Sequence, residues 1–162
     1  MSTKRIAKEY QDISQSPPSG FTVNLASEAS IYTWNIVLAP PQSSVYAPGR
    51  YGIQLVLPTD YPFKPPVVKF VTRIYHPNVT NDSLGNVCLG LLKSDVWKPS
   101  TRIIAVLDAL YNLLIEPQPD DPLEERIADE YRNNKASFET TAKQHVNRYA
   151  LAEPVFPAPG AA

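Results

Sequence analysis

The chain has 162 residues, a formal net charge of −1 and a single cysteine. Its length suits one domain with its own hydrophobic core. The near-neutral charge argues against a nucleic-acid partner, because proteins that bind nucleic acids present a basic surface to the phosphates. No apolar run approaches the ~20 residues that span a bilayer, so we expect no membrane contact. An opening segment without a secretory pattern and a lone cysteine fit a reducing compartment, the cytoplasm or the nucleus.

The first predicted elements are a helix and a set of strands. Apolar residues at helical spacing predict an amphipathic helix over 3–14, and Pro17-Pro18 ends it. Apolar residues then recur at about every second position over 21–25, 34–38 and 51–57, and 67–71 adds a short apolar run. Proline and glycine separate these runs, which is typical of a four-stranded antiparallel meander.

The second half of the chain predicts one irregular loop and three helices. We expect Pro99-Ser100 to open the first helix, residues 123–132 to form a short second one, and residues 135–149 to form the last. The first helix carries a core stripe and the last buries one face; these residues are Ile103, Val106, Leu107, Leu110 and Leu114, then Phe138, Ala142, Val146 and Tyr149. Strands followed by helices indicate an α+β domain over 1–150, and the Pro/Ala-rich tail over 151–162 is predicted to be disordered.

Two segments rich in turn-forming residues are candidates for function. Cys88 lies between glycines shortly after His76-Pro77-Asn78, so its thiol is either inert filling or a reactive nucleophile on a loop. The prolines within 61–66 stiffen a second loop, whose Phe63 either caps the core or is exposed. Two histidines and one cysteine match no metal-ligand spacing, and no glycine-rich phosphate loop is present. We therefore expect neither a metal nor a bound cofactor.

Five motifs in this order resemble the ubiquitin-conjugating enzymes. They are Tyr61-Pro62-Phe63-Lys64-Pro65-Pro66, His76-Pro77-Asn78, Cys88, Trp97-Lys98-Pro99 and Asp120-Asp121-Pro122-Leu123. The resemblance covers about residues 3–150, and the short tail is similar to members that consist of the catalytic domain with little added. It implies that Cys88 accepts ubiquitin as a thioester from an activating enzyme, which uses ATP upstream. Cys88 then passes ubiquitin to a substrate lysine or to a ligase cysteine.

The resemblance also implies roles around the thiol. The asparagine that matches Asn78 either stabilises the tetrahedral oxyanion or braces the loop of the cysteine, and the sequence leaves both open. Asp121 matches an acidic residue that receives the incoming lysine, although it or Asp120 could instead cap the following helix. We favour the functional role for Asp121, and we expect His76, with Pro77, to be structural rather than a general base.

The partners follow from the same resemblance. They are ubiquitin, an activating enzyme and ubiquitin ligases, with the chain itself a monomer. Ligases are expected to contact the first helix and two loops, at Lys4, Arg5, Lys8, Phe63, Lys98, Pro99 and Ser100. Lys98 resembles members that serve cysteine-bearing ligases and Asp121 resembles members that react with lysine, so the ligase class stays open. Whether Thr22 supports a second ubiquitin contact also stays open.

Two departures from the family pattern and three alternatives complete the interpretation. The segment between Asn78 and Cys88 is about two residues longer than in the commonest members. The position of Asn78 relative to the sulfur is therefore expected to differ from the family pattern. Asp108 replaces an apolar residue that holds the donor ubiquitin in well-known members, so we expect weaker closure and greater dependence on a ligase. The alternatives are a carrier of a ubiquitin-like modifier, a non-catalytic ubiquitin-binding variant, which the presence of Cys88 disfavours, and a plain scaffold domain.

Overall fold

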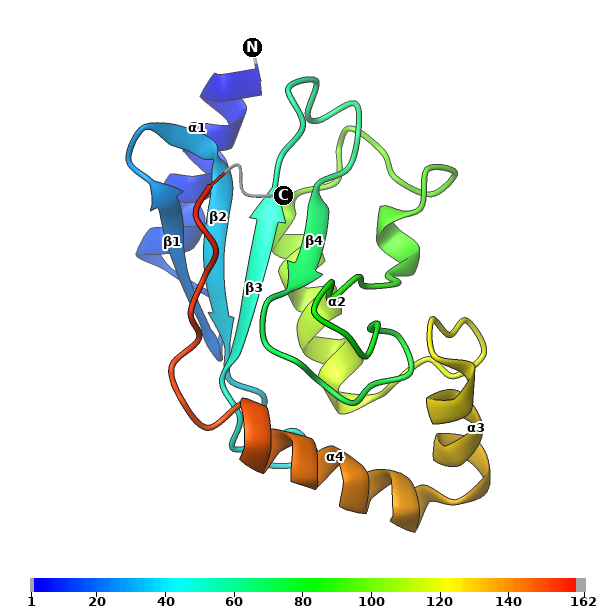
Figure 1. Cartoon of the computed structure of the whole chain (residues 1–162). Helices are drawn as coiled ribbons and strands as arrows, with labels where there is room; N and C mark the ends of the chain where they lie inside the picture. The colour runs from blue at the N-terminus through cyan, green and yellow to red at the C-terminus, as the bar shows by residue number, and fades with distance from the viewer. Residues whose placement is uncertain (1, 160–162) are drawn as a thin grey trace.

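In a computed structural model that describes residues 2–159, a helix precedes a four-stranded sheet and three further helices follow it (Figure 1). The elements are α1 (Ser2–Gln15), β1 (Phe21–Ser27), β2 (Ser30–Leu38), β3 (Tyr51–Val56), β4 (Val67–Phe70), the single 3-10 turn η1 (Gly90–Leu92), α2 (Ile103–Ile115), α3 (Glu125–Asn133) and α4 (Lys135–Tyr149). This order confirms the predicted α+β class. Among the described residues, no helix is both long and apolar enough to cross a bilayer.

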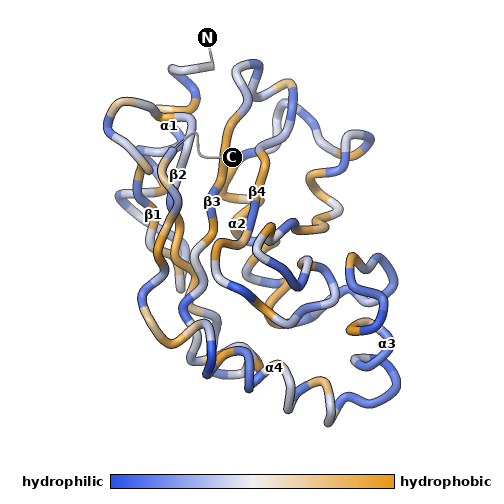
Figure 2. Tube along the Cα trace, in the orientation of Figure 1, coloured by the Kyte–Doolittle hydropathy of each residue, from blue (hydrophilic) through white to orange (hydrophobic). Residues whose placement is uncertain are grey.

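The sheet is an antiparallel meander in the order β1-β2-β3-β4, as predicted. Alternate residues of its strands are buried, including Trp34, Ile36 and Leu38 of β2. They share one core with α2, which lies behind the sheet in Figure 1. Figure 2 shows that apolar residues concentrate in the strands and α2, whereas α3 is mostly hydrophilic. The face of the sheet opposite α2 is its outer face, along which the segment 151–159 runs.

A buried carboxylate ties three segments together at one end of the core. Glu9 of α1 is 7% exposed and accepts hydrogen bonds from Tyr61 Oη at 2.6 Å and Arg5 Nε at 3.2 Å. Its second oxygen accepts the backbone N–H of Ile103 at 2.9 Å. Because this N–H is the first of α2, a side chain from α1 caps α2. The helix therefore begins at Ile103 and not at Pro99-Ser100, which corrects the prediction.

The prediction of a disordered tail covers 151–162, of which 160–162 lie outside the described residues. The segment 151–159 follows the outer face of the sheet (Figure 1). Glu153 forms an ion pair with Arg50 at 2.6 Å. Gly52 of β3 makes room for the segment, since a Cβ there would lie 2.7 Å from Pro154 Cβ and 3.3 Å from the ring of Phe156. A side chain at position 52 would therefore push the segment 151–159 away from β3.

Two further differences lie in the last helices. α3 begins at Glu125 and not at residue 123, because the N–H groups of Leu123 and Glu124 donate to Pro77 O. Tyr149 is half-buried and not buried. Its ring lies in contact range of His145 and of the Arg73 guanidinium, at 5.4 Å and 5.2 Å, so it covers the side of the helix instead of entering the core.

Candidate active site

The Cys88 thiol is half-buried and lies against a carboxylate. The Cys88 N–H donates to Asn78 O at 2.9 Å, and Sγ donates to Asp121 Oδ2 at 3.3 Å. Burial raises the pKa of the Cys88 thiol, and the hydrogen bond to Asp121 and its negative charge raise it further, while Lys93 opposes them. The resting sulfur is therefore protonated at neutral pH, and the group that accepts its hydrogen bond is a carboxylate rather than a histidine.

The long segment between Asn78 and Cys88 closes on itself. Val79 pairs with Val87, and Thr80 N–H donates to Asn86 O at 2.9 Å. The Asp82 carboxylate accepts from Leu84 N–H at 2.8 Å. The additional residues therefore project as a closed turn, and the backbone contact between Asn78 and Cys88 is intact despite them.

Gly85 fixes this turn to the sheet. Its φ is +62°, and a Cβ there would stand 1.8 Å from Phe70 O. Its own carbonyl accepts the N–H of Phe70 at 2.8 Å, so the turn pairs with the end of β4. Only glycine allows both the backbone conformation and this approach.

Asn78 is buried, and its side-chain amide is fully engaged with the backbone of the segment before α3. Nδ2 donates to Gln118 O at 2.8 Å and to Asp121 O at 3.0 Å, and Oδ1 accepts Gln118 N–H at 2.9 Å. Since both amide hydrogens donate to carbonyls, neither points at the sulfur.

His76 is fully buried beneath Asn78. Its Nδ1 accepts the Asn78 N–H at 2.9 Å, so Nε2 carries the proton and donates to Leu113 O at 2.8 Å. The ring stacks on Tyr46 with centroids 5.4 Å apart. Burial lowers the pKa of His76 to about 4, which the hydrogen bond to Leu113 only partly offsets. Both nitrogens of this neutral ring are used in hydrogen bonds to the backbone. His76 therefore supports the backbone and has no free nitrogen for proton transfer.

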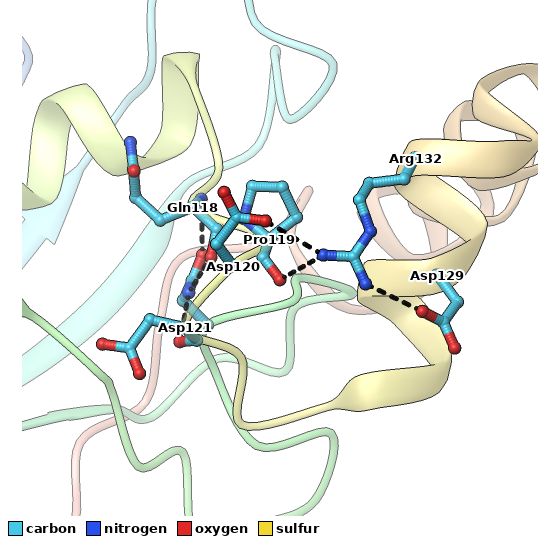
Figure 3. Close-up of polar contacts among 7 residues, drawn as sticks. Gln118, Pro119, Asp120, Asp121, Asp129 and Arg132 are labelled. Atoms are coloured by element: carbon cyan, nitrogen blue, oxygen red, sulfur yellow. Dashed lines mark hydrogen bonds and ion pairs between the residues drawn. The ribbon is translucent and has the colours of Figure 1, made fainter.

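Asp120 and Asp121 point in different directions (Figure 3). Asp120 pairs with Arg132 of α3 at 3.2 Å, and the same guanidinium donates to Pro119 O at 2.9 Å. Asp121 points away from Arg132, toward the thiol. Neither aspartate caps α3, whose N-cap is Glu124 and lacks a side-chain cap bond. The segment 118–121 is thus held by Asn78 on one side and Arg132 on the other.

Lys93 was not predicted as a site residue. It follows η1, and its ammonium pairs with the same Asp121 oxygen that accepts the Cys88 thiol. The ion pair with Lys93 is the main cause that lowers the pKa of Asp121, and the Asp121 carboxylate in turn raises the pKa of Lys93. No sequence pattern indicates this contact, because it depends on the 3-10 turn that folds the chain back after Cys88.

An open groove of about 390 Å³ leads to the thiol. Its walls are residues 88–90, the C-terminal half of α2, and Gln118 with Asp121. Asp108 is exposed on α2, next to the Ala109 of the groove wall. An extended chain end can therefore approach Sγ between the loop of Cys88 and α2.

The residues expected to contact ligases lie at the end of the molecule where α1 meets the two loops. Their exposed members are Lys4, Lys8, Phe63, Lys98, Pro99 and Ser100. Phe63 is 75% exposed, so it is an exposed residue of its loop and does not cap the core. Arg5 differs from them, since its guanidinium donates to Pro99 O at 2.5 Å, to Thr101 O at 2.8 Å and to Glu9. Arg5 thus holds the surface together and is not a free cation on it.

Comparison with known proteins agrees with this geometry. The family model described as ubiquitin-conjugating enzyme matches residues 5–146. A protein of Schizosaccharomyces pombe named "Ubiquitin-conjugating enzyme E2 14" is 45% identical to the chain over 149 residues, which are 92% of this chain and 94% of that relative.

Proposed function

The chain belongs to the ubiquitin-conjugating enzyme family, transferases that act through a thioester, and on that premise we propose that Cys88 is the acceptor thiol. The observation that carries the proposal is that the only cysteine of the sequence places its Sγ at the end of an open groove, beside a carboxylate. Thiol and thioester exchange acyl groups without a large free-energy change, so ubiquitin arrives activated and leaves activated. ATP is consumed upstream, by the activating enzyme.

In this proposal the protonated resting thiol suits its task. A thiol of raised pKa is a weak target for oxidants, because the thiolate is the species that reacts with them. Transfer to Cys88 then requires the thiol proton to leave as sulfur attacks the incoming thioester. The Asp121 carboxylate, 3.3 Å away, is placed to accept it.

Asp121 also receives the acceptor amine in the second half-reaction. A lysine ammonium has a reference pKa of ~10.4 and must lose a proton before it attacks. A carboxylate beside the thioester orients the ammonium, and its negative charge favours the charged form. Desolvation by the bound substrate must therefore supply the lowering of the amine pKa. Asn78 acts on this step indirectly, by fixing the backbone of Asp121.

Family membership implies ubiquitin, an activating enzyme and ligases as partners. Ligases bind this chain through Lys4, Lys8, Phe63 and the 98–100 loop, with Phe63 as the apolar anchor. Asp108 places a carboxylate on the helix face beside the groove, where a donor ubiquitin would pack. The closed state of the thioester therefore depends on a ligase.

The test is a charging reaction with activating enzyme, ATP and ubiquitin, resolved on a gel with and without reductant. We expect an adduct that reductant removes in the wild-type protein and no adduct in Cys88→Ala. Cys88→Ser should give an adduct that reductant leaves intact, because an oxygen ester replaces the thioester. Absence of any adduct on the wild-type protein overturns the proposal. Parallel reactions with ubiquitin-like modifiers and their own activating enzymes identify the modifier.

A further inference from the structure

Arg132 of α3 binds the segment 118–121 through the two residues at its centre (Figure 3). Nη1 donates to Pro119 O at 2.9 Å and to Asp120 Oδ1 at 3.2 Å. Nη2 donates to Asp129 Oδ1 at 2.9 Å, one turn earlier on the same helix. Because a guanidinium is planar and donates in fixed directions, the bond to Asp129 orients the group toward the segment. α3 therefore presents a fixed donor to this part of the chain.

The segment 118–121 carries the carboxylate of the site and lies outside the helices and strands. Asn78 binds its two ends, through the N–H and carbonyl of Gln118 and the carbonyl of Asp121. The two residues between these ends are the ones that Arg132 holds. The position of the Asp121 backbone thus depends on two anchors, one beneath the thiol loop and one on α3.

The value of the Arg132 contacts lies in their geometry. The side chain of Arg132 is 42% exposed and that of Asp120 is 96% exposed, and an ion pair in such surroundings adds little to stability. The bond to Pro119 O is different, because it fixes a backbone carbonyl two residues before Asp121. We therefore expect loss of the guanidinium to leave the protein folded and to loosen the segment.

We propose that Arg132 is a positioning residue for transfer to lysine, which holds the segment 118–121 so that the Asp121 carboxylate stays beside Cys88. The inference rests on the proposed function, in which Asp121 receives the acceptor amine. Arg132 acts through the backbone of the segment and not on the reacting atoms. A displacement of ~1 Å at a reacting group can lower a rate by about 100-fold, so a loosened segment slows the reaction.

The Cys88 thiol reports the position of Asp121 without any partner. Burial is the main cause of the raised pKa of this thiol, and the hydrogen bond and negative charge of Asp121 raise it further. If Asp121 moves away, these two contributions fall and the thiol ionises at lower pH. The rate of alkylation follows the thiolate fraction, and Cys88 is the only cysteine of the sequence, so the reagent reports on this sulfur alone.

The experiment combines two measurements on Arg132→Met, Asp121→Ala, the double variant and the wild-type chain. The first is alkylation of the uncharged protein by iodoacetamide as a function of pH. The second is the single-turnover rate of ubiquitin discharge onto free lysine after charging and removal of ATP. Arg126→Met is the matched control, since Arg126 is the other arginine of α3 and is exposed. Thermal melts of each variant establish that it is folded.

We expect Arg132→Met to shift the alkylation profile to lower pH and to slow discharge by about tenfold. This is less than the 10²–10⁴-fold contribution of a general base, because Asn78 still holds both ends of the segment. Arg126→Met should change neither measurement. In the Asp121→Ala background, Arg132→Met should have no further effect on either one, because a positioning residue acts through the group it positions.

Two results overturn the inference. One is an alkylation profile of Arg132→Met that matches the wild-type profile. The other is an equal slowing of discharge by Arg132→Met with and without Asp121, which would show a general structural effect. Failure of the wild-type chain to form a thioester, or discharge of Asp121→Ala at the wild-type rate, overturns the proposed function instead. The alkylation profile separates these cases, since it requires no ubiquitin.

Discussion

Replacing Asn78 by alanine separates the two roles that its residue type allows. The side chain makes three hydrogen bonds, two to carbonyls and one from the Gln118 N–H. At about 1 kcal/mol net for each bond, Asn78→Ala should cost about 3 kcal/mol of unfolding free energy. For a chain of this size that corresponds to a melting temperature lower by about 6–12 °C. The backbone of Asp121 should lose its position at the same time.

Three measurements test this reasoning. Urea unfolding gives the free energy, hydrogen exchange reports protection of the Gln118 amide, and the rate of thioester discharge onto free lysine gives the activity. Bracing predicts that stability, amide protection and discharge all fall. Asn112→Ala, an exposed asparagine on the wall of the same groove, is the matched control and should change stability by less than about 0.5 kcal/mol. Wild-type stability and a protected Gln118 amide, combined with a loss of discharge of about 100-fold or more, would refute bracing and assign Asn78 to the oxyanion.

Three further predictions concern the pH dependence of stability, one turn and ligase dependence. Because burial lowers the pKa of His76 to about 4, the unfolded chain binds a proton between pH ~6.5 and ~4 that the folded protein does not. Acidification across that window should remove about 3 kcal/mol of stability, and a urea-unfolding profile of His76→Gln with the same slope as wild type would contradict this. Gly85→Ala should lose at least about 2 kcal/mol in thermal melts because of its φ and the contact with Phe70 O. In Gly90→Ala the new Cβ meets no atom within 4 Å, so equal effects of the two changes would show that the turn is not constrained as described. Asp108→Leu should speed ligase-free discharge onto lysine, and an unchanged rate would remove Asp108 from the control of closure.

The sequence predicted the elements whose signals are local. Alternation located the strands, and the apolar stripe of α2 is buried as expected. β2 nevertheless begins at Ser30, well before the predicted 34. The prediction missed this start because the first residues of the strand are half-buried and do not alternate between buried and exposed. The starts of α2 and α3 were also wrong, since each is set by a tertiary contact, to Glu9 and to Pro77 O. Hydrogen bonds that come from distant segments leave no trace in the neighbouring residues.

The candidate site shows the same division. The order of the motifs identified Cys88, Asn78 and Asp121 as candidate site residues, and all three line one groove. The internal use of Arg5 and the pairing of Lys93 with Asp121 both escaped prediction. Residue type and spacing identify a lysine or arginine as a cation, but they do not say which carboxylate or carbonyl it will meet. For long flexible side chains, only the fold decides this.

The Glu9 cluster bears on how the choice of ligase can change over evolution or by engineering. Because one buried carboxylate fixes α1, the Tyr61 loop and the start of α2, the scaffold behind the ligase surface does not depend on the exposed side chains. Phe63 and Lys98 are free to be exchanged for residues that suit another ligase, with little effect on folding. A change at Glu9 would instead remove its hydrogen bonds to Tyr61, to Arg5 and to the first N–H of α2 together. Specificity and stability are thus encoded in separate residues of the same patch, and the enzyme can acquire new partners without losing its fold.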